Sequence, residues 1–138
     1  MKKQICTAIF LLIAGFSLYA QQPDYKVVFD MTTSDSATQQ SLIRQLELIR
    51  KENPAAKLEV VIYGQALGFV VKDQSKYVEA IGRIAADKNT IFNVCSFTMK
   101  RYNIDAGKLL PGIQVVNDGI YEIITKQREG WGYIKVAN

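Results

Sequence analysis

Apolar residues recur along the chain in two alternating patterns, which are short β-branched runs and longer stretches with helical spacing. The first run, Tyr25 to Met31, is typical of a strand buried on both faces. After a polar turn, apolar residues keep helical spacing until Asn53-Pro54 ends the helix: Leu42, Ile43, Leu46 and Ile49. Ser36, followed three residues later by Gln39, forms a capping-box pattern at the start of this helix. The first unit is therefore a strand followed by a helix.

The same alternation continues to the end of the chain. Residues 66–71 suit either a strand or a short helix, and the strand-helix rhythm on both sides favours a helical turn packed on the sheet. The other expected strands are Lys57 to Tyr63, Ile91 to Val94 ending at Cys95, Gly112 to Val116 and Tyr133 to Val136. The expected helices are one with Tyr77, Val78, Ile81, Ile84 and Ala85 on one face, Ser96 to Tyr102, and Gly119 to Gln127.

Strands and helices at this spacing predict an α/β fold. We expect a three-layer sandwich with a mostly parallel sheet of about five strands, helices on both faces and right-handed crossovers. The chain lacks internal repeats and Pro/Gly linkers after its first twenty residues. Residues 21–138 are therefore expected to form a single domain.

The first twenty residues have the three parts of a secretory signal peptide. Lys2 and Lys3 precede an apolar run from Ala8 to Leu18, and Ala20 precedes the polar Gln21. We therefore expect residues 1–20 to direct export, with a periplasmic or otherwise exported location and no stable membrane span after removal of the signal. Leu18 is not the small residue preferred three positions before cleavage, so an uncleaved anchor stays as an alternative.

Charge and residue content narrow the functional classes. Without the two signal lysines, 15 basic residues face 13 acidic ones, a net charge of +2, and the two signs are interleaved. This argues against a nucleic-acid-binding stripe. The chain has no histidine, which excludes Ser-His and Cys-His catalysis and His-based zinc sites, and we expect neither a metal nor a cofactor. Signal cleavage would remove Cys6 and leave Cys95 as the only thiol.

Residues beyond the carboxyl ends of the expected strands are the candidate site, because open parallel sheets bind ligands there. They are Asp30, Thr32, Gly64, Gln65, Cys95, Thr98 and Asn117. Cys95 stands where a strand ends and a helix begins, which favours a reactive thiolate, and Thr98 would help to stabilise it. The alternative is that Cys95 packs as a small buried hydrophobic residue.

Two further features admit more than one interpretation. The hydroxyl-rich segment 32–36 lacks a Gly-rich phosphate motif, so helix capping is favoured, although a phosphate of a flavin remains an alternative. Trp131 is expected to pack at the edge of the core, with a ligand platform or an oligomer contact as alternatives. The segment Ile120 to Ile124 is apolar around much of its helix, which indicates subunit contact.

Several segments in a fixed order resemble the DsrE/DsrF-like family of small α/β proteins, which includes bacterial sulfur-relay subunits. They are VIYGQAL (61–67), FNVCSFTMKRYNI (92–104), KLLPGIQVVNDGIYEI (108–123) and REGWGYIKV (128–136). The resemblance spans residues 25–136 and implies a parallel-sheet sandwich that assembles into trimers or hexamers. It also implies that Cys95 occupies the position that carries a persulfide in some members.

The sequence thus leaves two functional hypotheses. In the first, an exported protein holds a persulfide on Cys95 and passes sulfur between a donor and an acceptor, so that its activity is at most sulfur transfer. In the second, a non-catalytic oligomeric module binds a small ligand or a protein partner at the strand-end rim.

Overall fold

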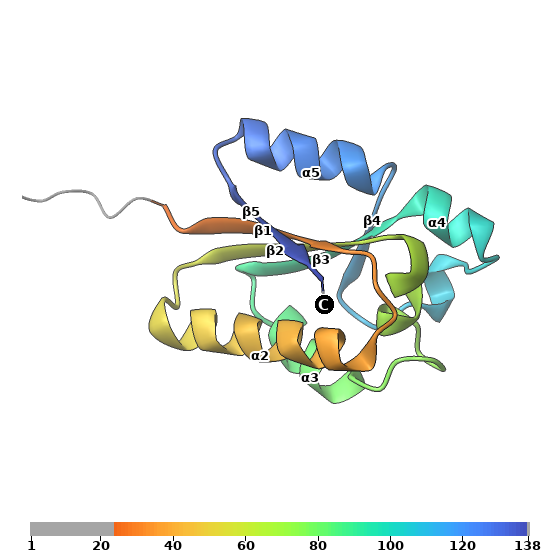
Figure 1. Ribbon diagram of the computed structural model, residues 1–138. Coiled ribbons are helices and arrows are strands. Elements are labelled where there is room, and N and C mark those ends of the chain that lie inside the picture. Colours follow the sequence, from red (N-terminus) through yellow and green to blue (C-terminus); the bar gives the residue numbers. More distant parts are fainter. Residues whose placement is uncertain (1–23, 138) are drawn as a thin grey trace, which may run out of the picture.

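The computed structural model describes residues 24–137, and strands and helices alternate along them (Figure 1). The expected signal peptide and Cys6 lie outside the described residues. The strands are β1 (Lys26–Met31), β2 (Lys57–Ile62), β3 (Thr90–Cys95), β4 (Ile113–Val116) and β5 (Gly132–Val136). The α-helices are α2 (Ser36–Glu52), α3 (Val78–Ala85), α4 (Ser96–Arg101) and α5 (Gly119–Arg128). Two 3-10 helices, η2 (Gly64–Val70) and η3 (Ala106–Lys108), are the remaining helices of the described residues.

All five strands are parallel and lie in the order β4-β3-β2-β1-β5. The expected α/β fold with a parallel sheet of about five strands is confirmed. From β1 to β4 the chain adds strands in one direction, and it then returns across the sheet to place β5 beside β1. Because crossovers between parallel strands are right-handed, this reversal puts α5 on the face opposite α2 and α3, as Figure 1 shows.

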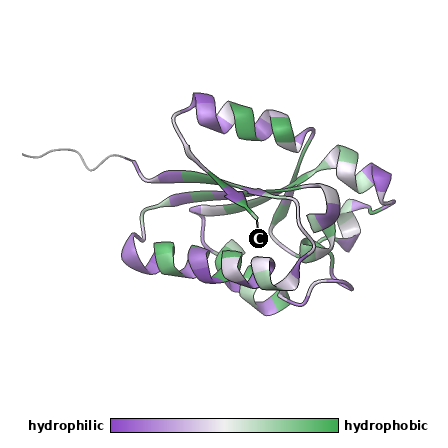
Figure 2. Ribbon diagram, in the orientation of Figure 1, coloured by the Kyte–Doolittle hydropathy of each residue, from purple (hydrophilic) through white to green (hydrophobic). Residues whose placement is uncertain are grey.

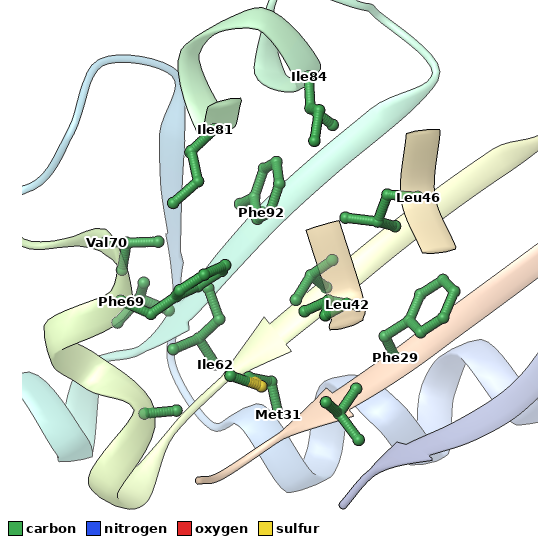
Figure 3. Packing of buried hydrophobic residues seen from close by; sticks show 14 of the residues in the cluster. Phe29, Met31, Leu42, Leu46, Ile62, Phe69, Val70, Ile81, Ile84 and Phe92 are labelled. Atoms are coloured by element: carbon green, nitrogen blue, oxygen red, sulfur yellow. The ribbon is translucent and has the colours of Figure 1, made fainter. Parts of the chain in front are cut away.

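The face covered by α2 and α3 holds the main hydrophobic core. Successive strand residues point to opposite faces, so alternate positions of the central strands enter this core. Phe29, Ile62 and Phe92, one from each of β1, β2 and β3, pack there at 0–1% exposure (Figure 3). Leu42 and Leu46 of α2, with Ile81 and Ile84 of α3, cover them on this face of the sheet.

The face covered by α5 is smaller and more polar. Its hydrophobic cluster contains Val28, Val61 and Ile123, with the partly buried Tyr63 and Trp131 packed against it. The intervening sheet positions on this face carry buried polar side chains, namely Asp30, Glu59 and Asn93. Hydrophobic and hydrophilic residues alternate along α5 in Figure 2, as expected of a helix that covers the sheet with one side only.

The observed elements correct two details of the sequence interpretation. Ser36 does not cap α2: the cap is Asp35, whose carboxylate accepts a hydrogen bond of 2.7 Å from the amide of Thr38. Gln39 instead donates to the carbonyl oxygen of Thr33. Val78 was expected on the buried face of its helix, but it is 43% exposed because it is the first residue of α3, beyond the cover of the core.

The ambiguous segment after β2 is helical, as expected, and forms η2 with Ala66, Leu67, Phe69 and Val70 buried. None of the helices in residues 24–137 is both long and apolar enough to cross a membrane.

Candidate functional site

The seven candidate residues all lie at the carboxyl edge of the sheet or just beyond it, but on two faces. Asp30 and Cys95 lie on the α5 face of the sheet, and Asn117 belongs to the turn between β4 and α5. Gln65 belongs to η2. Thr98 lies on the first turn of α4. The strand order places β3 between β2 and β4, so the end of β2 and the turn after β4 flank Cys95.

Cys95 is the last residue of β3 and the cap residue of α4, and it is 6% exposed. Its Sγ lies 3.9 Å from the carbonyl oxygen of Asn117, a long contact in which the thiol donates. Gly119 covers it closely, since a Cβ added at this glycine would lie 3.3 Å from the Cβ of Cys95 and 3.1 Å from Cγ1 of Val61. The first turn of α5 therefore rests directly on the thiol residue.

Thr98 holds the backbone at the end of β2 rather than the sulfur. Its Oγ1 accepts a hydrogen bond of 3.1 Å from the amide of Gly64, and the residue is 8% exposed. Gly64 has a φ of +61°, a left-handed conformation that favours glycine. This bond fixes the turn that carries the chain from β2 into η2, and it links that turn to α4.

A polar cluster lies at the ends of β1 and β5, which are two and three strands away from the strand of Cys95 in the sheet. The hydroxyl of Tyr133 donates to Oδ2 of Asp30 at 2.7 Å, and Nζ of Lys135 lies 3.0 Å from Oδ1 of Asp30 and 3.0 Å from Oγ1 of Thr32. Nζ of Lys135 also lies 5.8 Å from the ring centroid of Tyr63. Asp30 and Thr32, both expected at the site, thus meet three residues that the sequence did not indicate.

Burial and the carboxylate of Asp30 raise the pKa of Tyr63, and a charge on Cys95 contributes to the same shift. The pKa of Tyr133 is also raised, mainly because its hydroxyl donates to Asp30 and to a smaller extent because it is partly buried. Both phenols therefore stay protonated at neutral pH and serve as donors. Sequence patterns did not indicate Tyr133 and Lys135, because the pairing of β5 with β1 joins them to Asp30, which is 103 positions from Tyr133.

A second buried polar network lies under the middle of α5. Nδ2 of Asn93 donates to Oε1 of Glu59 at 2.8 Å, and Nζ of Lys126 lies 3.2 Å from Oε2 of the same carboxylate. Burial raises the pKa of Glu59, although Asn93 and Lys126 both oppose the shift. Burial is the largest single effect and would lower the pKa of Lys126, but Glu59, Glu122 and Glu129 together outweigh it, so that the pKa is raised.

The ring of Trp131 packs against this network. Nζ of Lys126 lies 5.0 Å from the centroid of its ring, and the side chain packs against the small cluster beneath α5. This agrees with the expected place at the edge of the core. The network attaches α5 to the sheet.

A cleft of about 340 Å³ opens at the same edge of the sheet. Gly64 and Gln65, which the sequence indicated, line it together with residues of α2, η2 and the segment after α4. Cys95 does not line it. Within residues 24–137, no three His, Cys, Asp or Glu side chains are grouped so that they could hold a metal ion.

The rim thus offers two separate features, namely a thiol shielded by the turn before α5 and an open cleft that Cys95 does not line.

Two solved structures of proteins of unknown function are similar to this chain. MTH1491 from Methanobacterium thermoautotrophicum is 29% identical, with a TM-score of 0.76, and the match covers 81% of this chain and 99% of that protein. BT1422 from Bacteroides thetaiotaomicron is 15% identical, with a TM-score of 0.69, and the match covers 84% and 98%. This second likeness is one of fold alone. No curated protein matched the chain.

The model of the DsrE/DsrF-like family matches residues 26–136, from the first strand to the last. Sheet order, strand ends and the place of Cys95 all lie within this match. The chain belongs to the DsrE/DsrF-like family.

Proposed function

We propose that this protein carries sulfur as a persulfide on Cys95. The observation that carries the proposal is the place of the thiol. Cys95 precedes the first turn of α4, and its Sγ lies 3.9 Å from Asn117, next to the turn that begins α5. The thiol donates in this contact, so the contact must be released before the sulfur can act as the attacking thiolate. The neutral phenol of Tyr63 lies on the same face.

The reaction is an exchange of sulfur between thiols. The Cys95 thiolate attacks the outer sulfur of a donor persulfide or polysulfide, the S–S bond of the donor breaks, and the donor leaves as a thiolate. An acceptor thiolate then attacks the outer sulfur of the Cys95 persulfide and releases Cys95 as a thiolate. Both steps conserve electrons, so neither requires an external oxidant or reductant.

Burial of Cys95 controls when this exchange can occur. At 6% exposure the thiol is shielded by the turn that contains Asn117 and Gly119. A donor reaches the sulfur only when this turn moves away from the sheet. The same cover would protect a bound persulfide from other thiols until an acceptor docks.

The test is peptide mass mapping after incubation with inorganic polysulfide and removal of the excess. We expect the tryptic peptide that contains Cys95 to gain one sulfur atom, whereas Cys95→Ser gains none there. Alkylation of Cys95 is measured in parallel in native buffer and in urea. An unmodified peptide, with a thiol that reacts only after unfolding, would exclude sulfur carriage.

That second outcome would favour a non-catalytic oligomeric module that binds a ligand or partner at the strand-end rim. The observation in its favour is the separation of Cys95 from the cleft that Gly64 and Gln65 line. A Cys95→Ser variant would then keep every binding activity of the protein.

Self-association into a trimer or hexamer is part of both proposals. Its support is the outer side of α5, where Ile120, Tyr121 and Ile124 are 55%, 68% and 47% exposed. Light scattering after gel filtration should give three or six times the protomer mass. Ile124→Lys should reduce this mass, and Leu48→Lys, at an exposed apolar position of α2 on the other face of the sheet, should not. A wild-type monomer would refute self-association.

Export to the periplasm is proposed from residues 1–20. Expression in a Gram-negative host, fractionation and N-terminal sequencing should place the protein in the periplasm with Gln21 as its first residue. A full-length chain in the cytoplasm would contradict export.

A further inference from the structure

The cleft at the carboxyl edge of β1 and β2 has its own chemistry, separate from that of Cys95. It encloses about 340 Å³, within the range of small-ligand pockets. Its apolar part is formed by Leu67, Phe69 and Ile104, and Tyr102, 47% exposed, stands at its rim. The cleft can therefore bury the apolar part of a small molecule.

The charged side chain that lines the cleft is positive. Lys76 lines it, and neither an Asp nor a Glu does. Lys76 forms no ion pair with any residue from 24 to 137. An unpaired ammonium group beside an apolar floor attracts a singly charged anion and would repel a cation.

Buried and tethered polar groups complete the lining. Gln39 is 8% exposed, and its Nε2 donates to the carbonyl oxygen of Thr33 at 3.2 Å, while its Oε1 accepts no hydrogen bond from the described residues. Ser36 is fixed by Tyr77, whose hydroxyl donates to the carbonyl oxygen of Ser36 at 2.6 Å. Gly64 is fixed by its bond to Thr98. Because these walls are held by the fold, little ordering is required when a ligand binds.

We infer that this cleft binds a small organic carboxylate that carries an apolar or aromatic group. The carboxylate lies at Lys76, and the apolar group lies against Phe69 and Tyr102. This inference specifies a ligand class for the binding-module function and is independent of persulfide chemistry on Cys95. The mass-mapping result for Cys95 and the binding result for the cleft can therefore fail separately.

The test uses three probes with the same ring and different charge: benzoate, benzamide and benzylamine. Each is titrated into the ¹⁵N-labelled protein, and the amide signals are followed by NMR. Benzoate should shift the amides of residues 64–69 and of Ser36 to Gln39, benzamide should bind more weakly, and benzylamine should not bind there. Added salt should weaken benzoate binding, because it screens exposed charges.

Variants separate the charge from the apolar contact. Lys76→Gln should weaken benzoate about two- to fivefold, the size of one exposed ion pair. Lys88→Gln, which removes an exposed charge before β3 and away from the cleft lining, should leave binding unchanged. Tyr102→Ala should weaken it about two- to tenfold through the loss of aromatic contact.

Three results would overturn the inference. The first is that the three probes bind equally well or not at all. The second is that the shifted amides lie away from the cleft. The third is that Lys76→Gln and Lys88→Gln have the same effect.

Discussion

Replacement of Lys126 by Met tests how α5 is held on the sheet. The Glu59 side chain is 1% exposed, and Lys126, itself 20% exposed, is its only cationic partner within the described chain. Removal of one partner of a fully buried ion pair costs about 3–5 kcal/mol. Because one fifth of Lys126 is open to water, we expect Lys126→Met to lower the free energy of unfolding by about 2–3 kcal/mol at pH 7.

The loss should depend on pH in a defined direction. Burial raises the folded-state pKa of Glu59 above its ordinary value of 4.5, so the folded protein holds this proton more tightly than the unfolded chain does. The resulting stability is present below pH 4.5 and is lost as the pH rises through the raised pKa. Without Lys126 that pKa rises further, so the difference between variant and wild type should shrink to below about 1 kcal/mol near pH 4.

Urea unfolding followed by circular dichroism at pH 4 and pH 7 measures both quantities. The matched control is the double variant Glu59→Gln/Lys126→Met, in which the amide can still accept from Asn93 and no buried charge remains. It should recover most of the loss at pH 7. An equal loss at both pH values, or no recovery in the double variant, would refute the account of Glu59 as a buried charge that depends on Lys126.

Three other residues give shorter tests. Gly119→Ala should lower the free energy of unfolding by about 1–2 kcal/mol, since its methyl group would press on Cys95. Unchanged urea unfolding would mean that the first turn of α5 can shift to admit the methyl group without loss of stability. Asp35→Ala should cost about 1 kcal/mol in the same assay and Ser36→Ala much less, because Asp35 is the cap of α2. A larger loss for Ser36→Ala would mean that Ser36 is the cap instead. Since the folded-state pKa of Tyr63 lies above its ordinary 10.0, stability should fall as the pH rises beyond 10; Tyr63→Phe should flatten this fall, and an unchanged slope would contradict the shift.

The secondary structure could be predicted from sequence because its causes are local. The continuous buried run along Lys57–Ile62 and the helical spacing along Ser36–Glu52 both follow from the order of neighbouring residues. The observed strand bounds differ by about one residue from those expected. The cap of α2 was misassigned because both Asp35 and Ser36 suit that position. Only the hydrogen bond to Thr38 distinguishes them.

The candidate site was predicted only in part. The rule that loops at the carboxyl ends of parallel strands gather at one edge correctly brought Asp30, Gly64, Cys95 and Asn117 to that edge. It could not tell which face each residue would take, because that depends on strand order. The rule also did not indicate Lys76, which lines the cleft, because this residue lies between η2 and α3 and far from any strand end in sequence.

The sequence by itself determined the alternation of strands and helices, the family, and the presence of one thiol at the end of β3. The tertiary structure decided that α5 would close over that thiol and that β5 would return to pair with β1. That return brings Tyr133 and Lys135 to Asp30. Local patterns report each residue's preference for helix or strand and for burial, whereas the contacts that shield or charge a side chain form between segments whose order in the sheet only the folded chain establishes.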